Sequence, residues 1–397
     1  MLIMKRIDRR QFLKVLNFFY LSLVTTLFTS SRTKKCFGDY WRDNLNTNKD
    51  YKPIVLRMYN DKATHWDFKK GNYIEYIKND VVAVLFEEGL KTFTNSCRIK
   101  ESWLKVLTNY EPGDIITLKP NLNALQLGYN KNICTTPVVI NTVIKSLVNS
   151  LKVQPNKIYV YDLCVNPKLI EKIIDYPVNC IGKYDNTICG KIQKRMNYGL
   201  GGFDKKAKII MSTPINEDGK NIDCYMPKVL TETKHLINIP TVKSHQFLLL
   251  SGAMKNHFGT VRFSNGSQYP TILHNCINHA ISDIYRNEHI KQKTRLIIVD
   301  GLFGAPLYGT KNYKGRLPVK WKTLGNNSLN SLFFSTDPVA TESVLSDIIQ
   351  KEQSYRKIAS KSSEYLKLAN KKGLGVVERS ISQLYKRIEY IQKDVTT

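Results

Sequence analysis

Residues 236–261, LINIPTVKSHQFLLLSGAMKNHFGTV, decide how the rest of the chain is interpreted. Three of the first four residues are apolar, and this short run predicts a buried strand. Pro240 is expected to end this strand, because proline cannot continue a central ladder. Two lysines, two histidines, an asparagine and two glycines then follow between positions 243 and 259. Polar loops beyond strand ends are where α/β proteins bind their ligands, so this segment predicts both a sheet and a site.

The remaining chain alternates between predicted strands and helices. Strands are expected at residues 54–56, 115–118, 157–161, 207–211, 295–299 and 331–334, and helices at residues 80–94, 138–151, 168–174, 271–289 and 339–349. This alternation predicts an α/β domain over residues 54–350, with a mostly parallel sheet and crossover helices. Residues 351–397 are rich in charge and predict a helical C-terminal tail.

Several polar residues fall at or just after the predicted strands. Since the carboxyl ends of parallel strands share one edge of a sheet, we expect them to line one pocket. The expected ligand-binding residues are Lys119, Asn121, Asp162, Lys243, Ser251, Asn256 and Asp337. An aspartate at a strand end can equally be a turn or a cap, and Asp337 before Pro338 is expected to cap a helix in any case.

His245, Lys255 and Asp300 are the candidate catalytic residues. His245 would be a general base or a metal ligand, with His257 as a second ligand. Lys255 would bind an anion or, with a lowered pKa, act as a nucleophile. In the alternative interpretation, His245 is an ordinary loop histidine and Lys255 is solvated.

Several stretches resemble the domain of unknown function 362 family. Residues 237–259 follow its segment INIP-x-x-K-T/S-H-…-G-A-x-K-N-x-F-G. Further matching pieces are LKPN at 118–121, TTP at 135–137, IVDG at 298–301 and TDPVA at 336–340. The resemblance covers residues 115–345 and implies a fold and a site, but no reaction.

A shorter stretch is similar to nickel-pincer lactate racemases. The spacing of His245, Ser251-Gly252 and Lys255 matches the segment in which their histidine binds nickel and their lysine carries a pyridinium-derived cofactor. The resemblance implies a nickel-pincer-like cofactor as a minority hypothesis beside an unspecified metal ion. The other catalytic histidines of those enzymes have no counterpart by motif.

The eight cysteines form no C-x-x-C pair. Some relatives in the 362 family carry a ferredoxin-type iron–sulfur segment, which needs closely spaced cysteines, so no such cluster is expected. Mostly buried free thiols are expected, with disulfides as the alternative. The chain also lacks a G-x-x-x-x-G-K-[ST] loop and a G-x-S-x-G elbow, which argues against P-loop and serine-hydrolase chemistry.

The first 35 residues predict a targeting segment. The sequence RRQFLK at residues 9–14 resembles the twin-arginine export motif and precedes an apolar run at residues 15–28. We expect export by the twin-arginine translocase to a periplasmic or other extracytoplasmic location. Because no small-x-small cleavage site is evident, the segment could also anchor the protein to the membrane. Residues 36–53 read as a linker, and an amphipathic helix of a cytoplasmic protein is the alternative for the first segment.

The formal charge of +27 is the remaining signal of function. The lysines are spread along the chain instead of forming one stripe, so a nucleic-acid partner is not expected. The sequence therefore predicts an enzyme of unassigned reaction that uses a metal or organic cofactor. A non-catalytic binding protein for a small anionic ligand and a basic surface that binds polyanions are the alternatives.

Overall fold

The computed structural model describes residues 52–396, apart from residues 70, 124, 184–201, 218, 266–269 and 311–314. The predicted export segment, and the linker up to residue 51, lie outside the described residues. None of the helices in the described part combines the length and apolar character that a membrane crossing requires.

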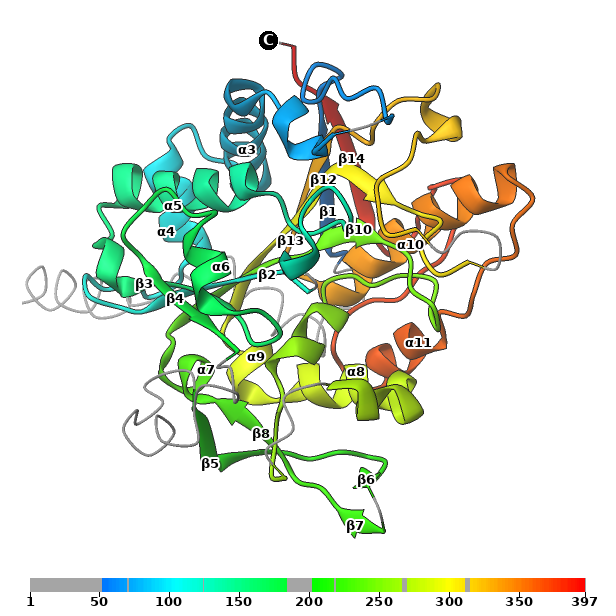
Figure 1. Ribbon diagram of the computed structural model, residues 1–397. Helices are drawn as coiled ribbons and strands as arrows, with labels where there is room; N and C mark the ends of the chain where they lie inside the picture. Colours follow the sequence, from blue (N-terminus) through cyan, green and yellow to red (C-terminus); the bar gives the residue numbers. More distant parts are fainter. Residues whose placement is uncertain are drawn as a thin grey trace, which may run out of the picture.

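The centre of the molecule is a nine-stranded sheet (Figure 1). Its strands follow the spatial order β14-β1-β13-β12-β9-β2-β3-β4, and β10 pairs with β12 beside this path. From β12 to β4 neighbouring strands run parallel, whereas β13 is antiparallel to both β12 and β1. The strands are β1 (Ile54–Tyr59), β2 (Ile116–Pro120), β3 (Ile158–Asp162), β4 (Asn179–Gly182), β9 (His235–Ile239), β10 (Thr241–Lys243), β12 (Thr294–Ala305), β13 (Ser331–Ser335) and β14 (Glu389–Asp394). The predicted α/β class with a mostly parallel sheet is confirmed.

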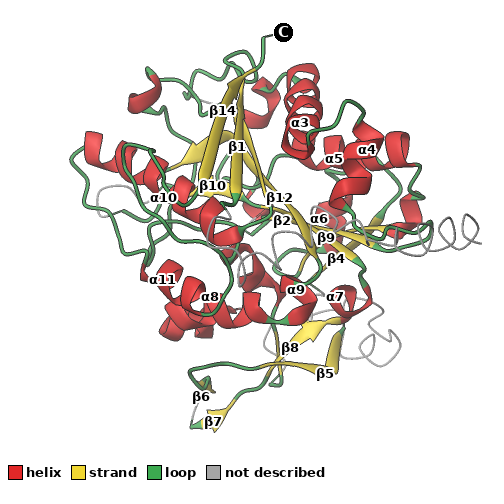
Figure 2. Cartoon of the chain, turned by 180° about the vertical axis from the view of Figure 1, so that it is seen from behind, coloured by secondary structure: helices red, strands yellow, loops and turns green. Residues whose placement is uncertain are grey.

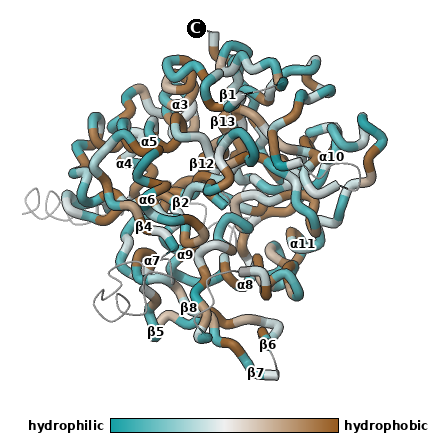
Figure 3. The backbone as a smooth tube through the Cα atoms, viewed as in Figure 1, coloured by the Kyte–Doolittle hydropathy of each residue, from teal (hydrophilic) through white to brown (hydrophobic). Residues whose placement is uncertain are grey.

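Helices cover both faces of this sheet (Figure 2). Leu56 of β1 packs in the core with α3, α4 and α5, whereas the residue before it, Val55, points to the other face and packs with α10. Successive strand residues point to opposite faces, and both faces are buried, which explains the nearly continuous apolar runs. The main helices are α3 (Asn79–Thr94), α4 (Ile99–Val106), α5 (Pro137–Leu151), α6 (Pro167–Glu171), α7 (Lys228–Glu232), α8 (Ile277–Arg286), α9 (Glu288–Lys291), α10 (Pro338–Tyr355) and α11 (Glu364–Lys371). Figure 3 shows hydrophilic and hydrophobic residues alternating along the outer helices.

A small antiparallel sheet lies apart from the main one. The predicted strand at residues 207–211 corresponds to β5 (Phe203–Ile209), which pairs with β8 (Cys224–Pro227) and not with the central sheet. β11 (Arg262–Phe263) completes this sheet, and β6 (Asn216–Glu217) and β7 (Lys220–Asn221) form a hairpin at the same end of the molecule (Figure 1). The charged residues of β5 face solvent, as antiparallel strands permit.

The C-terminal tail is helical only as far as α11. Residues 389–394 form β14, which pairs in parallel with β1 at the edge of the central sheet, so the helical prediction is wrong for this segment. Ile391 packs against the core on one face and Tyr390 against the core on the other. The other side chains of β14 are mostly exposed and charged, which hides the strand pattern in the sequence.

Candidate functional site

A cavity of about 180 Å³ lies at the carboxyl ends of β2 and β3, beside β10 and the 3₁₀ helix η6 (Lys255–Thr260). Seven residues predicted from the sequence line it, namely Asn121, Asp162, Lys243, His245, Ser251, Lys255 and Asn256. The sequence did not indicate most of its other lining residues, which include Asn123, Asn132, Cys164, Phe258, Tyr308 and Arg316, whereas it did suggest His274, also in the lining, as a further ligand. Segments far apart along the chain thus meet at the predicted sheet edge.

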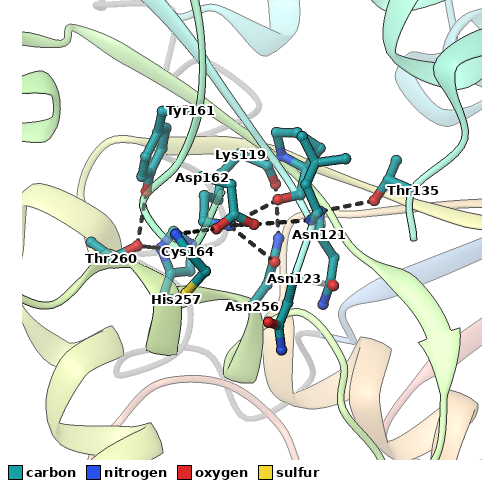
Figure 4. Close-up of polar contacts among 12 residues, drawn as sticks. Lys119, Asn121, Asn123, Thr135, Tyr161, Asp162, Cys164, Asn256, His257 and Thr260 are labelled. Carbon is teal, nitrogen blue, oxygen red and sulfur yellow. Dashed lines mark hydrogen bonds and ion pairs between the residues drawn. The ribbon is translucent and has the colours of Figure 1, made fainter. Parts of the chain in front are cut away.

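The side chain of Lys119 is buried and joins several elements around the site through polar contacts (Figure 4). Its ammonium is fully buried and donates hydrogen bonds to Asp162 Oδ2 at 3.1 Å, to the carbonyl of Pro120 at 2.8 Å and to Asn256 Oδ1 at 3.3 Å. These contacts join β2, β3 and η6. Lys119 does not line the cavity, and its side chain holds the elements around the site together.

Asp162 has little capacity left for a ligand. Besides the ion pair with Lys119, it accepts hydrogen bonds from the backbone amides of Leu122 at 2.9 Å and Cys164 at 3.0 Å. Asp162 is also the only carboxylate among the cavity-lining residues of the described chain. Its charge is balanced locally by Lys119, so the remaining charged groups of the lining are cations.

The amide of Asn256 fixes η6 to the sheet. Its Nδ2 donates to the carbonyl of Lys119 and to Asn238 Oδ1, both at 2.8 Å. Asn238, in β9, donates in turn to the carbonyl of Ala253 at 2.8 Å. Asn238 and Asn256 therefore hold the loop that contains η6 against the strands of the sheet.

Two lysines line the cavity in different settings. Lys243 is buried and donates to Asn121 Oδ1 at 3.0 Å and to the carbonyl of Ile133 at 3.4 Å, and burial lowers its pKa. Lys255 is half-buried, its Nζ lies 4.2 Å from the centre of the Phe258 ring, and no acceptor in the described chain takes a hydrogen bond from it. Burial, and after it the charge of Lys243, lowers the pKa of Lys255 to about 7.

His245 is held as a hydrogen-bond donor. The backbone amide of Phe247 donates to His245 Nδ1 at 3.2 Å, so the proton of the neutral ring is on Nε2. Burial, followed by the charge of Lys255, lowers the pKa of His245 to about 2, which keeps the ring neutral. The ring stacks on His274, with centroids 5.5 Å apart and planes 8° apart. With Nδ1 occupied and Nε2 protonated, this ring has no free lone pair for a metal or a proton.

His257 does not join His245. It lies outside the cavity lining, packs edge-on against Tyr285, and places Nδ1 3.2 Å from Thr260 Oγ1, which contacts the hydroxyl of Tyr161 at 3.0 Å (Figure 4). The described residues contain no group of three or more His, Cys, Asp or Glu placed to hold a metal ion. The donor set around His245 and His257 therefore does not fit a metal centre, and metal or nickel-pincer binding stays a prediction without support from this arrangement.

Asp300 and Asp337 lie outside the cavity lining. Asp300 Oδ2 accepts from the backbone amide and hydroxyl of Thr136 at 2.6 and 2.7 Å, at the start of α5, and burial raises the pKa of its carboxyl. Asp337 caps α10 by accepting from the amides of Val339 and Ala340, as expected from its position before Pro338. Because β13 is antiparallel to β12, Asp337 lies at the opposite edge of the sheet. The structure does not bring either aspartate into the pocket predicted for it.

The six cysteines of the described chain are all free, while Cys36 and Cys189 lie outside it. Cys164 lines the cavity, and burial raises the pKa of its thiol to about 12. At neutral pH this side chain is therefore a thiol and not a thiolate nucleophile.

The fold and the site together define an α/β protein with a mostly parallel sheet and a cationic, amide-lined pocket at the carboxyl edge. The model of one family, described as a domain of unknown function (DUF362), matches residues 116–347. The match covers more than half of the chain and runs from β2 into α10, so the protein belongs to this family. A search of curated proteins found no match.

Proposed function

We propose that the protein is an enzyme that acts on a small organic anion, either substrate or cofactor, held in this cavity. The supporting observation is the charge of the lining. Lys243, Lys255 and Arg316 contribute cations, whereas the lining carboxylate, Asp162, is neutralised by Lys119. A partly enclosed hollow lined with cations of this kind attracts carboxylates and phosphates.

Each lining residue has a role that follows from its contacts. Lys243 is a fixed point charge, because Asn121 and the Ile133 carbonyl hold its ammonium. Lys255 has no such restraint and is the group that reacts with, or moves toward, the ligand. The Nε2–H of His245 donates a hydrogen bond to a ligand oxygen.

The test is calorimetric titration of the protein with phosphate and oxalate, and with glycerol as an uncharged comparison. We expect saturable binding of the anions and none of glycerol, and Lys255→Met should weaken the binding. Lys367→Met is the matched control, because Lys367 is exposed on α11 and pairs with Glu364, away from the cavity lining. Equal heats for the anions and for glycerol would remove the basis of the proposal.

A non-catalytic anion-binding protein is the second candidate. It is favoured by the contacts of His245 and Asp162, since His245 Nδ1 and both oxygens of Asp162 already accept hydrogen bonds within the protein. This candidate predicts affinity without turnover, and binding that tolerates His245→Gln, whose amide retains a donor. A basic surface that binds polyanions instead predicts affinity that falls steeply with salt.

We further propose that the protein is exported through its amino-terminal segment. The support is the sequence RRQFLK at residues 9–14, followed by the apolar run at residues 15–28. The twin-arginine route carries folded proteins, so an organic cofactor would enter the cavity before transport.

A further inference from the structure

We propose that Lys255 captures a small oxo acid, a molecule carrying both a carbonyl and a carboxylate group, as an imine. This inference rests on the proposed function and names its substrate class. The amine of Lys255 adds to the carbonyl carbon, and the carbonyl oxygen takes a proton to give a carbinolamine. Water then leaves with that oxygen as the C=N bond forms. The sequence of steps needs no oxidant or reductant.

Three lysines near the cavity allow a comparison within one molecule. Lys119 is saturated by a carboxylate and two further oxygens, and Lys243 is held by an amide and a carbonyl oxygen. Both groups are therefore held in place by their hydrogen bonds. Lys255 instead rests on the face of Phe258, with no oxygen acceptor in the described chain. Of the three, Lys255 is the amine whose loss of a proton breaks no hydrogen bond.

The surroundings of Lys255 also disfavour its charge. It shares the cavity with the ammonium of Lys243, while the carboxylate of Asp162 is already paired with Lys119. Glu342 is an opposing group, since its charge raises the pKa of Lys255, but its Oε1 already accepts from the amide of Met254 at 2.6 Å. Burial raises the pKa of Glu342 to about 7, which makes its negative charge incomplete at neutral pH. A large fraction of Lys255 is consequently the neutral, nucleophilic amine.

The remaining lining residues match the other parts of an oxo acid. Lys243 and Arg316 supply cations for the carboxylate, and His245 Nε2 supplies a proton donor for the carbonyl oxygen. The wall beside η6 is tight, since a Cβ on Gly259 would lie 3.1 Å from Cys164 Sγ and 3.2 Å from Asp162 Oδ1. This close wall favours small molecules over extended ones.

The experiment is trapping of the imine in the full-length protein with sodium cyanoborohydride. Glyoxylate and acetaldehyde are compared at equal concentration near pH 7.5, and adducts are located by peptide mass mapping. The ratio of adduct at Lys255 to adduct at the exposed Lys367 corrects for the different intrinsic reactivity of the two aldehydes. We expect this ratio to be about tenfold or more higher with glyoxylate, because the carboxylate contributes a charged hydrogen bond.

Two variants sharpen the result. Lys255→Arg should lose the adduct from its peptide, and Lys243→Met should reduce the preference for glyoxylate. If Lys255→Arg does not fold, the positions of the adducts in the unsubstituted protein decide the question. Adduct spread equally over Lys255 and Lys367, or none at Lys255, overturns the inference. Saturable phosphate binding in the same preparation would then leave the proposed function standing. If neither a preferred adduct at Lys255 nor phosphate binding is found, both proposals are refuted.

Discussion

Replacing Lys243 by methionine tests whether a fixed buried cation organises the pocket. The substitution keeps an unbranched side chain of similar length but removes the ammonium that Asn121 and the Ile133 carbonyl hold. A hydrogen bond to a charged group contributes about 1.5–3 kcal/mol net, so the dissociation constant for phosphate or oxalate should rise about 10- to 100-fold. Titration calorimetry measures this directly.

The same substitution should also raise the pKa of Lys255. The positive charge of Lys243 lowers the pKa of Lys255, so its removal should raise that pKa and leave less neutral amine at pH 7. Amine-directed labelling of Lys255, followed by mass spectrometry from pH 6 to pH 9, should therefore shift its midpoint upward. Lys367→Met is the control for both measurements. Anion affinity within twofold of the parent, together with an unchanged labelling midpoint, would refute the reasoning.

In the unsubstituted protein, labelling of Lys255 should rise with a midpoint near pH 7, because its pKa is lowered to about 7, while exposed lysines reach half-labelling only at much higher pH. A common midpoint for all lysines would contradict this. Asp337→Ala should lower the free energy of unfolding by about 2–4 kcal/mol, since it removes the cap of α10 and leaves the buried amide of Val376 without its acceptor. Thermal melting checks this loss, and an unchanged midpoint would argue against the cap. Exchange of Arg9 and Arg10 for lysine should retain the protein in the cytoplasm on cell fractionation, and continued export would rule out the twin-arginine route.

The sequence was sufficient for β2, β3, β9 and β12 of the parallel part of the sheet, but not for β4 and β10. Asn121, Asp162 and Lys243 meet because β2, β3 and β10 all run in the same direction. Asp337 was misplaced by the same rule, since local sequence does not state that β13 runs the opposite way. Strand direction is decided by tertiary pairing, which a pattern of apolar residues does not encode.

Two other features lay beyond motif reasoning. Arg316 enters the cavity lining from a long loop without strand or helix signals, so nothing in its neighbourhood marks it. The role of His245 depends on the backbone amide of Phe247, which selects the ring nitrogen that carries the proton. A histidine in a polar loop suggests a base or a ligand, and only the conformation of the loop identifies a donor.

The pairing of β1 with β14 joins residues 54–59 to residues 389–394 at the rim of the central sheet. These segments are more than three hundred positions apart, so β1 cannot pair with β14 until the chain has left the ribosome as far as residue 394. A copy clipped before residue 389 would present the bare amides and carbonyls of an otherwise buried apolar strand, which is a template for intermolecular association. Protection of the sheet edge against self-association thus depends on β14, a short and largely charged strand that takes no part in the pocket.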